Sequence, residues 1–489
     1  MVVATFSQDA SNLDGLAPGR GNPLAQVNQG LFELRGCYYE DNAVVPRLAK
    51  SWTVDPDGLT WTIKLQEGAN WHDRPPVNGR RFTSADVAWT VEQQQKGGRL
   101  RTYWIDVTHA EPDAATVVFK LQKPDADFLA KLGHHENRMY AREIAEQLGD
   151  FKAVAIGTGP LMLEAYTPGQ DSTLKKNPKY YLNGTDGKPL PYLDEVRSVA
   201  LGDSVAELVA LRTGQLDHST ALGLRPTDAA TMRQSVPKLR YYQQIQFTHW
   251  ALWFALDRSP WDNPDVRKAL AAAVNREEII QANHGLPVHS SFVPAFLKDY
   301  TWTPEKAKEK FKMDKDAAKR LLDSAGFDVN KEYELRTAGL YQPEAEIVQQ
   351  QLKAVGIKTK VEVEAQSFSS IITTKKVKDL AWGAISTPPF VGYNMGDFIL
   401  AGGSQNHTGV KDAKLNELAI AQSRALDPRQ RKLLIDQIQD RLYELMPWVP
   451  ALSNVYHHFQ SCRLRNASQV NPAYNQPALA EAWLDPTGC

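Results

Sequence analysis

The alternation of apolar and polar residues is clearest near the start of the chain. Residues 59–65 alternate between the two kinds, which predicts a half-buried strand. Asp57-Gly58 just before them is a turn signal, because glycine accepts a positive φ at no steric cost. Thr83-Ser84-Ala85-Asp86 has the spacing of a capping box and predicts a helix that continues to Gln95.

Helical and strand patterns continue along the chain and alternate in its second half. Strands are predicted at 116–121, 250–256 and 357–363, and helices at 206–214, 265–281, 317–326, 344–356 and 427–445. Helices alternating with strands are typical of an α/β fold. The sequence therefore predicts an α/β architecture for the second half of the chain.

Length and charge narrow the class of protein. A chain of 489 residues is expected to form two or more domains. The formal net charge of −1 gives no electrostatic reason to expect nucleic acid or an anionic membrane as partner. No apolar stretch is long enough for a transmembrane helix, and Met1–Phe6 lack the features of a signal peptide. We expect either a cytosolic protein or the mature form of an exported one.

The three cysteines, at 37, 462 and 489, are few enough for a cytosolic or an exported protein. Their spacing suggests neither a zinc site nor a redox dithiol. Cys462 and Cys489 are both near the C-terminus and could form a disulfide, but nothing in the sequence fixes their distance, and three unpaired thiols are the default interpretation.

The sequence has no motif that is typical of an enzyme active site. Gly157-Thr158-Gly159 lacks the third glycine of a dinucleotide loop, and no G-x-S-x-G or H-E-x-x-H occurs. His72-Asp73 could be an acid/base pair, but a structural hydrogen bond in a turn is the simpler interpretation. His134-His135 and His457-His458 lack helical metal-ligand spacing. We therefore predict a binding protein with no cofactor, no metal and no catalytic residues.

Several segments in fixed order carry a family resemblance. Residues 45–52, 57–65, 71–73 and 82–87 resemble the signature of the extracellular solute-binding proteins of family 5, the oligopeptide- and dipeptide-binding group of ABC importers. Matches continue at Gly157-Thr158-Gly159-Pro160, at 176–181, at 214–217 and at 265–270, so the resemblance covers nearly the whole chain. The chain departs from the family pattern at Trp71, usually Phe, and at Arg74, usually Gly.

The resemblance implies an α/β, two-lobed periplasmic binding protein fold of the large type, with the ligand cleft between the lobes. Lobe I would comprise 1–44, 157–250 and 451–489, with an inserted subdomain at 45–156, and lobe II would comprise 251–450. Chain crossings near Trp250 and Pro450 would form a hinge. A ligand that contacts both lobes only when they are shut would stabilise the closed state.

The resemblance and the aromatic content together suggest ligand-binding residues. The chain has 12 tryptophans and 17 tyrosines, and aromatic rings supply large contact areas at small entropic cost. The strand entering lobe II lines the ligand site in this family. The candidates are Trp250, Trp253 and Asp257 from that strand region, and Trp382, Ser386, Tyr393 and Asn394 from the segment after 379.

One family feature is missing. In peptide binders, the segment that Asp379-Leu380-Ala381 resembles supplies an Asp for the ligand's α-ammonium, and here that position holds Pro388. A buried ammonium without a partner charge is costly, so Asp257 or Asp397 would have to replace it. Neutral oligosaccharides need aromatic platforms and amides instead, so peptide and oligosaccharide ligands both stay open.

The expected function is to capture a solute outside the cytoplasm, in the periplasm or on the cell surface, and to deliver it to a membrane ABC permease. We expect a monomer that binds no nucleic acid. A secreted glycan or peptide hydrolase is an alternative, which paired carboxylates would support. A ligand-sensing receptor module is another alternative, and the sequence cannot separate it from transport.

Overall fold

The structure is a computed structural model, and it describes the chain in sixteen stretches. These are residues 1–5, 13–16, 26–34, 44–134, 136–168, 170–201, 204–219, 226–246, 248–283, 288–374, 377–387, 390–403, 405–467, 470–471, 476–477 and 479–488. The chain forms two units. Unit 1 is Met1–Gln244 with Tyr456–Cys489, and unit 2 is Ile245–Val455, so the chain passes between the units twice.

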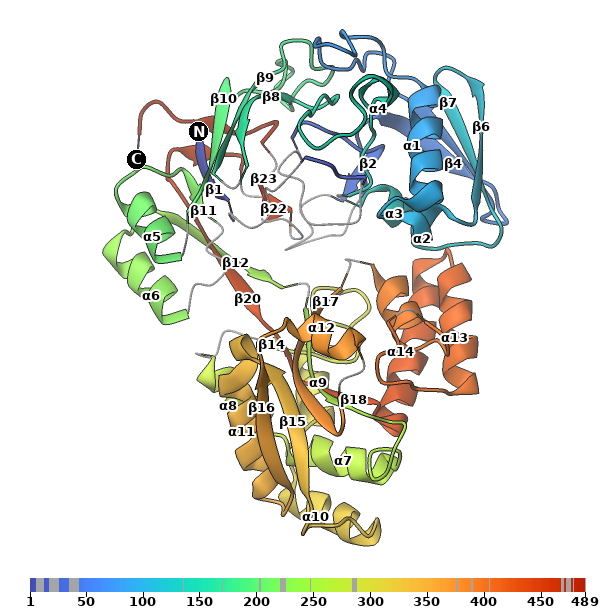
Figure 1. Ribbon diagram of the computed structural model, residues 1–489, viewed down its shortest axis with the longest axis vertical. Coiled ribbons are helices and arrows are strands. Elements are labelled where there is room, and N and C mark those ends of the chain that lie inside the picture. The colour runs from blue at the N-terminus through green and yellow to red at the C-terminus, as the bar shows by residue number, and fades with distance from the viewer. Residues whose placement is uncertain are drawn as a thin grey trace. The chain divides into compact units, whose positions relative to one another are not determined.

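The larger sheet of unit 1 has seven strands in the order β12-β20-β11-β1-β10-β9-β8 (Figure 1). They are β1 (Val2–Thr5), β8 (Leu161–Thr167), β9 (Asp171–Lys176), β10 (Glu195–Ala200), β11 (His218–Ser219), β12 (Arg240–Ile245) and β20 (Val455–Gln460). Strand β1 is parallel to β10 and β11, and β20 is antiparallel to β11. Leu211 of α5 (Ser204–Arg212) and Met232 of α6 (Pro226–Ser235) pack with Phe459 of β20, so these helices cover the sheet.

A second sheet of unit 1 is antiparallel throughout, in the order β4-β5-β7-β6. Its strands are β4 (Ala49–Val54), β5 (Thr60–Leu65), β6 (Val107–Asp113) and β7 (Thr116–Leu121). Strand β5 confirms the strand predicted over 59–65, with Ile63 buried and Lys64 exposed. The helices of this part are α1 (Ser84–Gly97), α2 (Arg101–Trp104), α3 (Phe128–Leu132) and α4 (Arg142–Leu148), and a hairpin pairs β2 (Phe32–Leu34) with β3 (Val44–Pro46).

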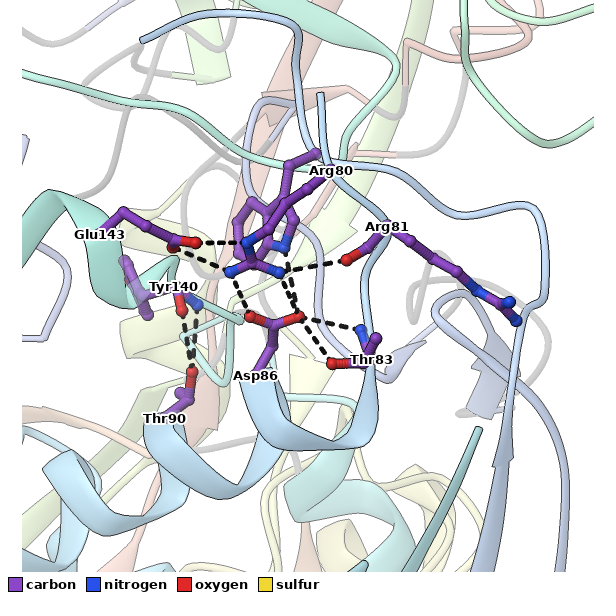
Figure 2. A network of polar contacts seen from close by, with 8 residues as sticks. Arg80, Arg81, Thr83, Asp86, Thr90, Tyr140 and Glu143 are labelled. Carbon is purple, nitrogen blue, oxygen red and sulfur yellow. Dashed lines mark hydrogen bonds and ion pairs between the residues drawn. The ribbon is translucent and has the colours of Figure 1, made fainter. Parts of the chain in front are cut away.

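Helix α1 begins with the predicted capping box, because the Asp86 carboxylate accepts a hydrogen bond from the Thr83 N–H at 2.9 Å. Figure 2 shows that the same carboxylate is the centre of a network. Arg80 donates to both Asp86 oxygens, at 2.6 and 2.9 Å, and also to Glu143 of α4 at 2.8 Å. The Trp71 indole N–H donates to Asp86 as well, at 3.3 Å. Through Arg80, these hydrogen bonds and ion pairs connect the first turn of α1 to α4.

Unit 2 is built on a five-stranded sheet in the order β16-β15-β17-β13-β18. The strands are β13 (Thr248–Phe254), β15 (Glu332–Ala338), β16 (Lys358–Glu364), β17 (Leu380–Ser386) and β18 (Trp448–Pro450). Strand β15 is parallel to β16 and β17, and β13 is antiparallel to β17 and β18. All seven residues of β13 are buried, as expected of a strand covered on both faces.

The described helices of unit 2 are α7 (Pro264–Ala273), α8 (Arg276–Ala282), α9 (Pro304–Lys310), α10 (Lys315–Ser324), α11 (Gln342–Lys353), α12 (Phe368–Thr373), α13 (Ala413–Arg424) and α14 (Pro428–Leu445). A short antiparallel pair joins β14 (Val288–His289) and β19 (Leu452–Ser453), which are far apart in the sequence. The prediction of one helix over 265–281 was wrong. Helix α7 ends before Val274. The Asn275 side chain then caps α8 by accepting a hydrogen bond from the Glu278 N–H.

Two buried arginines hold unit 2 together. Arg267 of α7 donates to the carbonyls of Leu445 and Met446, at the end of α14, and to that of Trp261. Arg276 donates to three other carbonyls, from three separate segments, and burial lowers its pKa to about 9. Both guanidiniums therefore supply hydrogen-bond donors to backbone carbonyls of segments that are far apart in the sequence.

Two short strand pairs complete the C-terminal part of unit 1. They are β21 (Leu464–Arg465) with β24 (Trp483–Leu484), and β22 (Val470–Asn471) with β23 (Gln476–Pro477). Cys462 is disulfide-bonded, and the other two cysteines of the chain lie outside the described residues. The pairing of Cys462 with Cys489 stays a prediction. It is supported by the hydrogen bond from the Asp485 N–H to the Arg463 carbonyl, which brings the two ends of this segment together at 2.8 Å.

Candidate functional site

The topology of the unit 2 sheet places several strand ends at one edge. The three strands β15, β16 and β17 run in the same direction and end at Ala338, Glu364 and Ser386. Strand β13 is antiparallel to β17 and begins at that edge, with Thr248 opposite Ser386. Loops at the carboxyl ends of parallel strands are where α/β sheets commonly bind ligands. We call this end of unit 2 the carboxyl edge.

Aromatic rings meet beside the carboxyl edge. Trp250 of β13 makes a T-shaped contact with Tyr341, with ring centroids 4.8 Å apart, and its indole N–H donates to the Thr248 hydroxyl at 3.1 Å. Tyr341 also contacts Phe368, at 5.8 Å. Two of the predicted site residues therefore belong to this edge: Trp250, which is 6% exposed, and the exposed Ser386.

The other two predicted tryptophans are buried within the sheet. Trp253 is 1% exposed, and its indole N–H donates to the Gly383 carbonyl at 3.2 Å. Trp382 is 0% exposed and lies opposite Leu252 in the next strand. In this structure both rings are part of the hydrophobic core, so their role as stacking platforms stays a prediction that burial does not favour.

A cavity of about 110 Å³ lies at the opposite end of β13 and has Trp253 and Asp257 in its wall. Asp257 is exposed, and its two oxygens pair with Arg258 at 2.9 Å each. Because Phe254 lies opposite Leu380, the first residue of β17, this cavity is at the amino ends of the parallel strands. Strand geometry, at about 3.3 Å per residue, separates it from the carboxyl edge by about 20 Å.

Tyr393 and Asn394 lie in a short π-helical turn, η3 (Tyr393–Asp397). Asn394 is 3% exposed and donates to the Phe390 carbonyl at 3.1 Å, so one of its side-chain N–H groups is used within the turn. Tyr393 is half-buried, and burial raises the pKa of its hydroxyl. Pro388 lies outside the described residues. No described contact joins these residues to the carboxyl edge.

Sequence reasoning missed an acid at the carboxyl edge. Glu344 is the third residue of α11, which follows β15 after the short turn η2 (Gly339–Tyr341). It is 8% exposed, and its Oε2 has no hydrogen-bond partner among the described residues. Burial raises the pKa of this carboxyl group, and its own backbone N–H and then the Asn283 side chain oppose the rise.

The helix dipole alone does not account for the burial of Glu344. An acid in the first turn of a helix gains about 0.3–1 kcal/mol from the helix dipole. A buried polar group without a partner costs about 1–3 kcal/mol. The cost exceeds the gain, whereas an exposed acid would keep the gain without the cost. The order strand, short turn, helix was visible in the sequence at 332–356, and it could have drawn attention to an acid placed directly after the turn.

The family signature residues His72 and Gly157 have a structural role in unit 1. The His72 ring bridges the segment at Gly157, accepting from the Gly157 N–H at 3.3 Å and lying 2.9 Å from the Gly159 carbonyl. Burial lowers the pKa of His72 to about 4. A Cβ on Gly157 would lie 1.9 Å from the Val27 carbonyl oxygen. These glycines therefore permit close backbone packing, which agrees with the structural interpretation of His72.

Comparison with known proteins decides the family. The description that matches is "Bacterial extracellular solute-binding proteins, family 5 Middle", over residues 43–406. The chain belongs to this family. The resemblance drawn from the signature segments is thereby confirmed, and the members with which the chain was compared are binding proteins rather than enzymes.

Family 5 relatives match most of the chain. Glutathione-binding protein GsiB of Salmonella typhi is 25% identical over 443 residues, covering 86% of this chain and 82% of GsiB. The solved structure of the ABC transporter substrate-binding protein CtaP from Listeria monocytogenes superposes with a TM-score of 0.82 at 21% identity, covering 99% of each chain. DppA from Helicobacter pylori in complex with peptide STSA gives 0.76 at 21% identity, covering 99% of this chain and 98% of DppA.

These likenesses confirm the predicted fold class, the large two-lobed α/β fold of periplasmic binding proteins. Within the described part of the chain, no helix combines the length and the apolarity needed to span a bilayer. The same residues contain no cluster of three or more His, Cys, Asp or Glu side chains placed to hold a metal ion.

Proposed function

We propose that this family 5 protein is the substrate-binding component of an ABC importer and that its ligand is a peptide. The family match over residues 43–406 carries the proposal. The ligand class is supported by GsiB, named as glutathione-binding, and by DppA, solved with a bound peptide. The carboxyl edge of unit 2 offers aromatic rings and a buried carboxylate, which suit a ligand with apolar groups and a positive charge.

An extracytoplasmic location fits the chemistry of Cys462. Disulfides persist in oxidising compartments and are rare in the cytosol, and Cys462 is disulfide-bonded. We place the protein in the periplasm or at the outer face of the cell membrane. Its docking to a membrane permease, its monomeric state and the hinge closure inferred from the resemblance stay predictions.

Oligosaccharides are the second ligand class that the sequence left open. Their case rested on the missing acid and on aromatic platforms and amides, and two of the candidate platforms, Trp253 and Trp382, are almost fully buried. No described feature favours a hydrolase or a sensor module over transport. Peptides are therefore the class to test first.

Thermal unfolding with a ligand panel tests the proposal. The panel contains di- to pentapeptides, glutathione, and α- and β-linked oligosaccharides. A ligand present at about 100 times its dissociation constant stabilises the native state by about 2.7 kcal/mol, a readily measured shift. We expect peptides to raise the melting temperature. A shift with sugars alone would overturn the peptide assignment, and turnover of any bound compound would overturn the assignment as a binding protein.

A further inference from the structure

Glu344 has the surroundings of a receptor for a cation. Its side chain is 8% exposed, and Oε2 has no hydrogen-bond partner among the described residues. Burial raises the pKa of the carboxyl group, against the opposing effects of its own backbone N–H and of Asn283 at the end of α8. Tyr341, one turn earlier, lies close enough for the Glu344 charge to raise the pKa of its hydroxyl, after the larger effect of burial. No described Lys or Arg side chain forms an ion pair with Glu344. Among the described residues, the carboxylate is thus buried without a counter-charge.

Apolar surface lies next to this carboxylate. Leu340, in the turn between β15 and α11, is 79% exposed, the highest value among the large apolar side chains of the described residues. Val363, near the end of the neighbouring strand β16, is 46% exposed. The paired rings of Tyr341 and Trp250 complete the apolar surroundings. A single exposed leucine is ordinary on a protein surface, but an exposed leucine close in sequence to a buried acid suits a ligand that is cationic at one point and apolar beside it.

The position within the fold links these side chains to binding. Leu340, Tyr341 and Glu344 all follow the carboxyl end of β15, and Val363 lies near the carboxyl end of β16. They come from the two strand ends that α/β sheets use for ligands. The cavity at the opposite end of β13 has none of these residues in its wall.

We propose that Glu344 receives the primary ammonium group of the ligand and that Leu340 packs against the adjoining apolar part. This proposal rests on the proposed function, because it assigns a role in the binding of peptides with a free amino terminus. An ammonium has three N–H donors, so one of them supplies the partner that Oε2 lacks. Glu344 of α11 would then bind the positive charge of the ligand, in place of the acid that peptide binders of the family have at the position of Pro388.

The test compares peptides that differ only in the charge of the amino terminus. A set of tetrapeptides, each with a free and with an acetylated amino terminus, is titrated into the wild-type protein and into Glu344→Gln by calorimetry. We expect the wild type to prefer the free amine by about 10- to 100-fold, the range for a hydrogen bond to a charged group. Glu344→Gln should lose this preference and should melt no lower than the wild type without ligand, since a buried charge has been removed.

Glu346→Gln is the matched control. It makes the same change on the same helix, at an exposed residue that pairs with Gln342 at 2.8 Å. It should keep the full preference for the free amine. Leu340→Ser changes an exposed side chain and leaves folding intact. It should weaken both peptide forms equally, by about 10-fold, if the leucine becomes buried on binding.

Each outcome decides the proposal. If the wild type prefers the free amine and Glu344→Gln keeps that preference, the Glu344 assignment is wrong and the peptide-binding function stands. If the wild type binds both peptide forms equally, no ammonium is recognised, and the proposal again fails while the function stands. If no peptide of either form binds, both this inference and the peptide assignment are overturned. Should Glu344→Gln fail to fold, the wild-type comparison of the two forms still decides whether an ammonium is recognised.

Discussion

Mild acid should destabilise unit 1 through His218. This residue of β11 is 0% exposed, and neither ring nitrogen has a hydrogen-bond partner among the described residues. Its ring is stacked on that of His458, with centroids 6.4 Å apart. Burial lowers the pKa of His218 to about 3. The folded protein therefore keeps this imidazole neutral over a range of pH in which the unfolded chain protonates it.

The sign and size of the effect follow from linkage. An unfolded histidine has a pKa of about 6.5, so below that pH the unfolded state binds a proton at this residue and the folded state does not. Stability is fully present well above about pH 6.5 and is lost as the pH falls toward the folded pKa. Between about pH 7.5 and about pH 5.5, the loss for one such histidine is about 1.4 kcal/mol.

Urea unfolding at these two pH values measures the effect, and the variant His218→Leu isolates it. Leucine is similar in volume, and no described hydrogen bond is lost. The variant should show a pH-dependent loss of stability that is smaller than that of the wild type by about 1.4 kcal/mol. His249 of β13, 3% exposed with a pKa lowered to about 3, is the matched case in unit 2. An unchanged pH dependence in His218→Leu would refute the reasoning, because it would mean that His218 titrates normally in the folded protein.

Two further predictions concern the stability of unit 2 and the disulfide of Cys462. Arg267→Met should lower the free energy of unfolding of unit 2 by about 3–5 kcal/mol in urea titrations, because the carbonyls of Trp261, Leu445 and Met446 lose a charged donor, and a loss below about 1 kcal/mol would contradict this. Peptide mapping without reduction should find Cys462 linked to Cys489, since β24 returns the chain to β21, and a link to Cys37 would contradict the expectation.

Local patterns predicted elements well where a single physical signal dominated. The alternation over 59–65 and the capping box at Thr83 led to β5 and α1 within a few residues, because strand period and helix capping are properties of neighbouring residues. The helix expected over 265–281 was wrong, since Asn275 can either continue a helix or cap a new one. The alternative that prevails depends on packing that the pattern does not contain.

Side-chain environments at the candidate site were harder to predict. A strand pattern with apolar residues on both faces, as at Trp250 and Trp253, does not tell which ring lies in the core. Glu344 was missed for a related reason. In the sequence it is an ordinary acid in a first helical turn, and its burial depends on tertiary packing, including an interaction with Asn283, which lies far from it along the chain.

The chain order of unit 1 has a consequence for biosynthesis. Strand β20 lies between β12 and β11 in the seven-stranded sheet, yet it begins at Val455, the last residue of unit 2. A chain that emerges from its amino end cannot complete that sheet until its last tenth has appeared. Unit 2, by contrast, is one uninterrupted stretch, Ile245–Val455, and has all its strands earlier. Unit 2 can thus complete its sheet before the seven-stranded sheet of unit 1 does. A chain cut short before β20 would leave β11 as an open edge and β12 without a neighbouring strand, and unpaired strands are prone to aggregation.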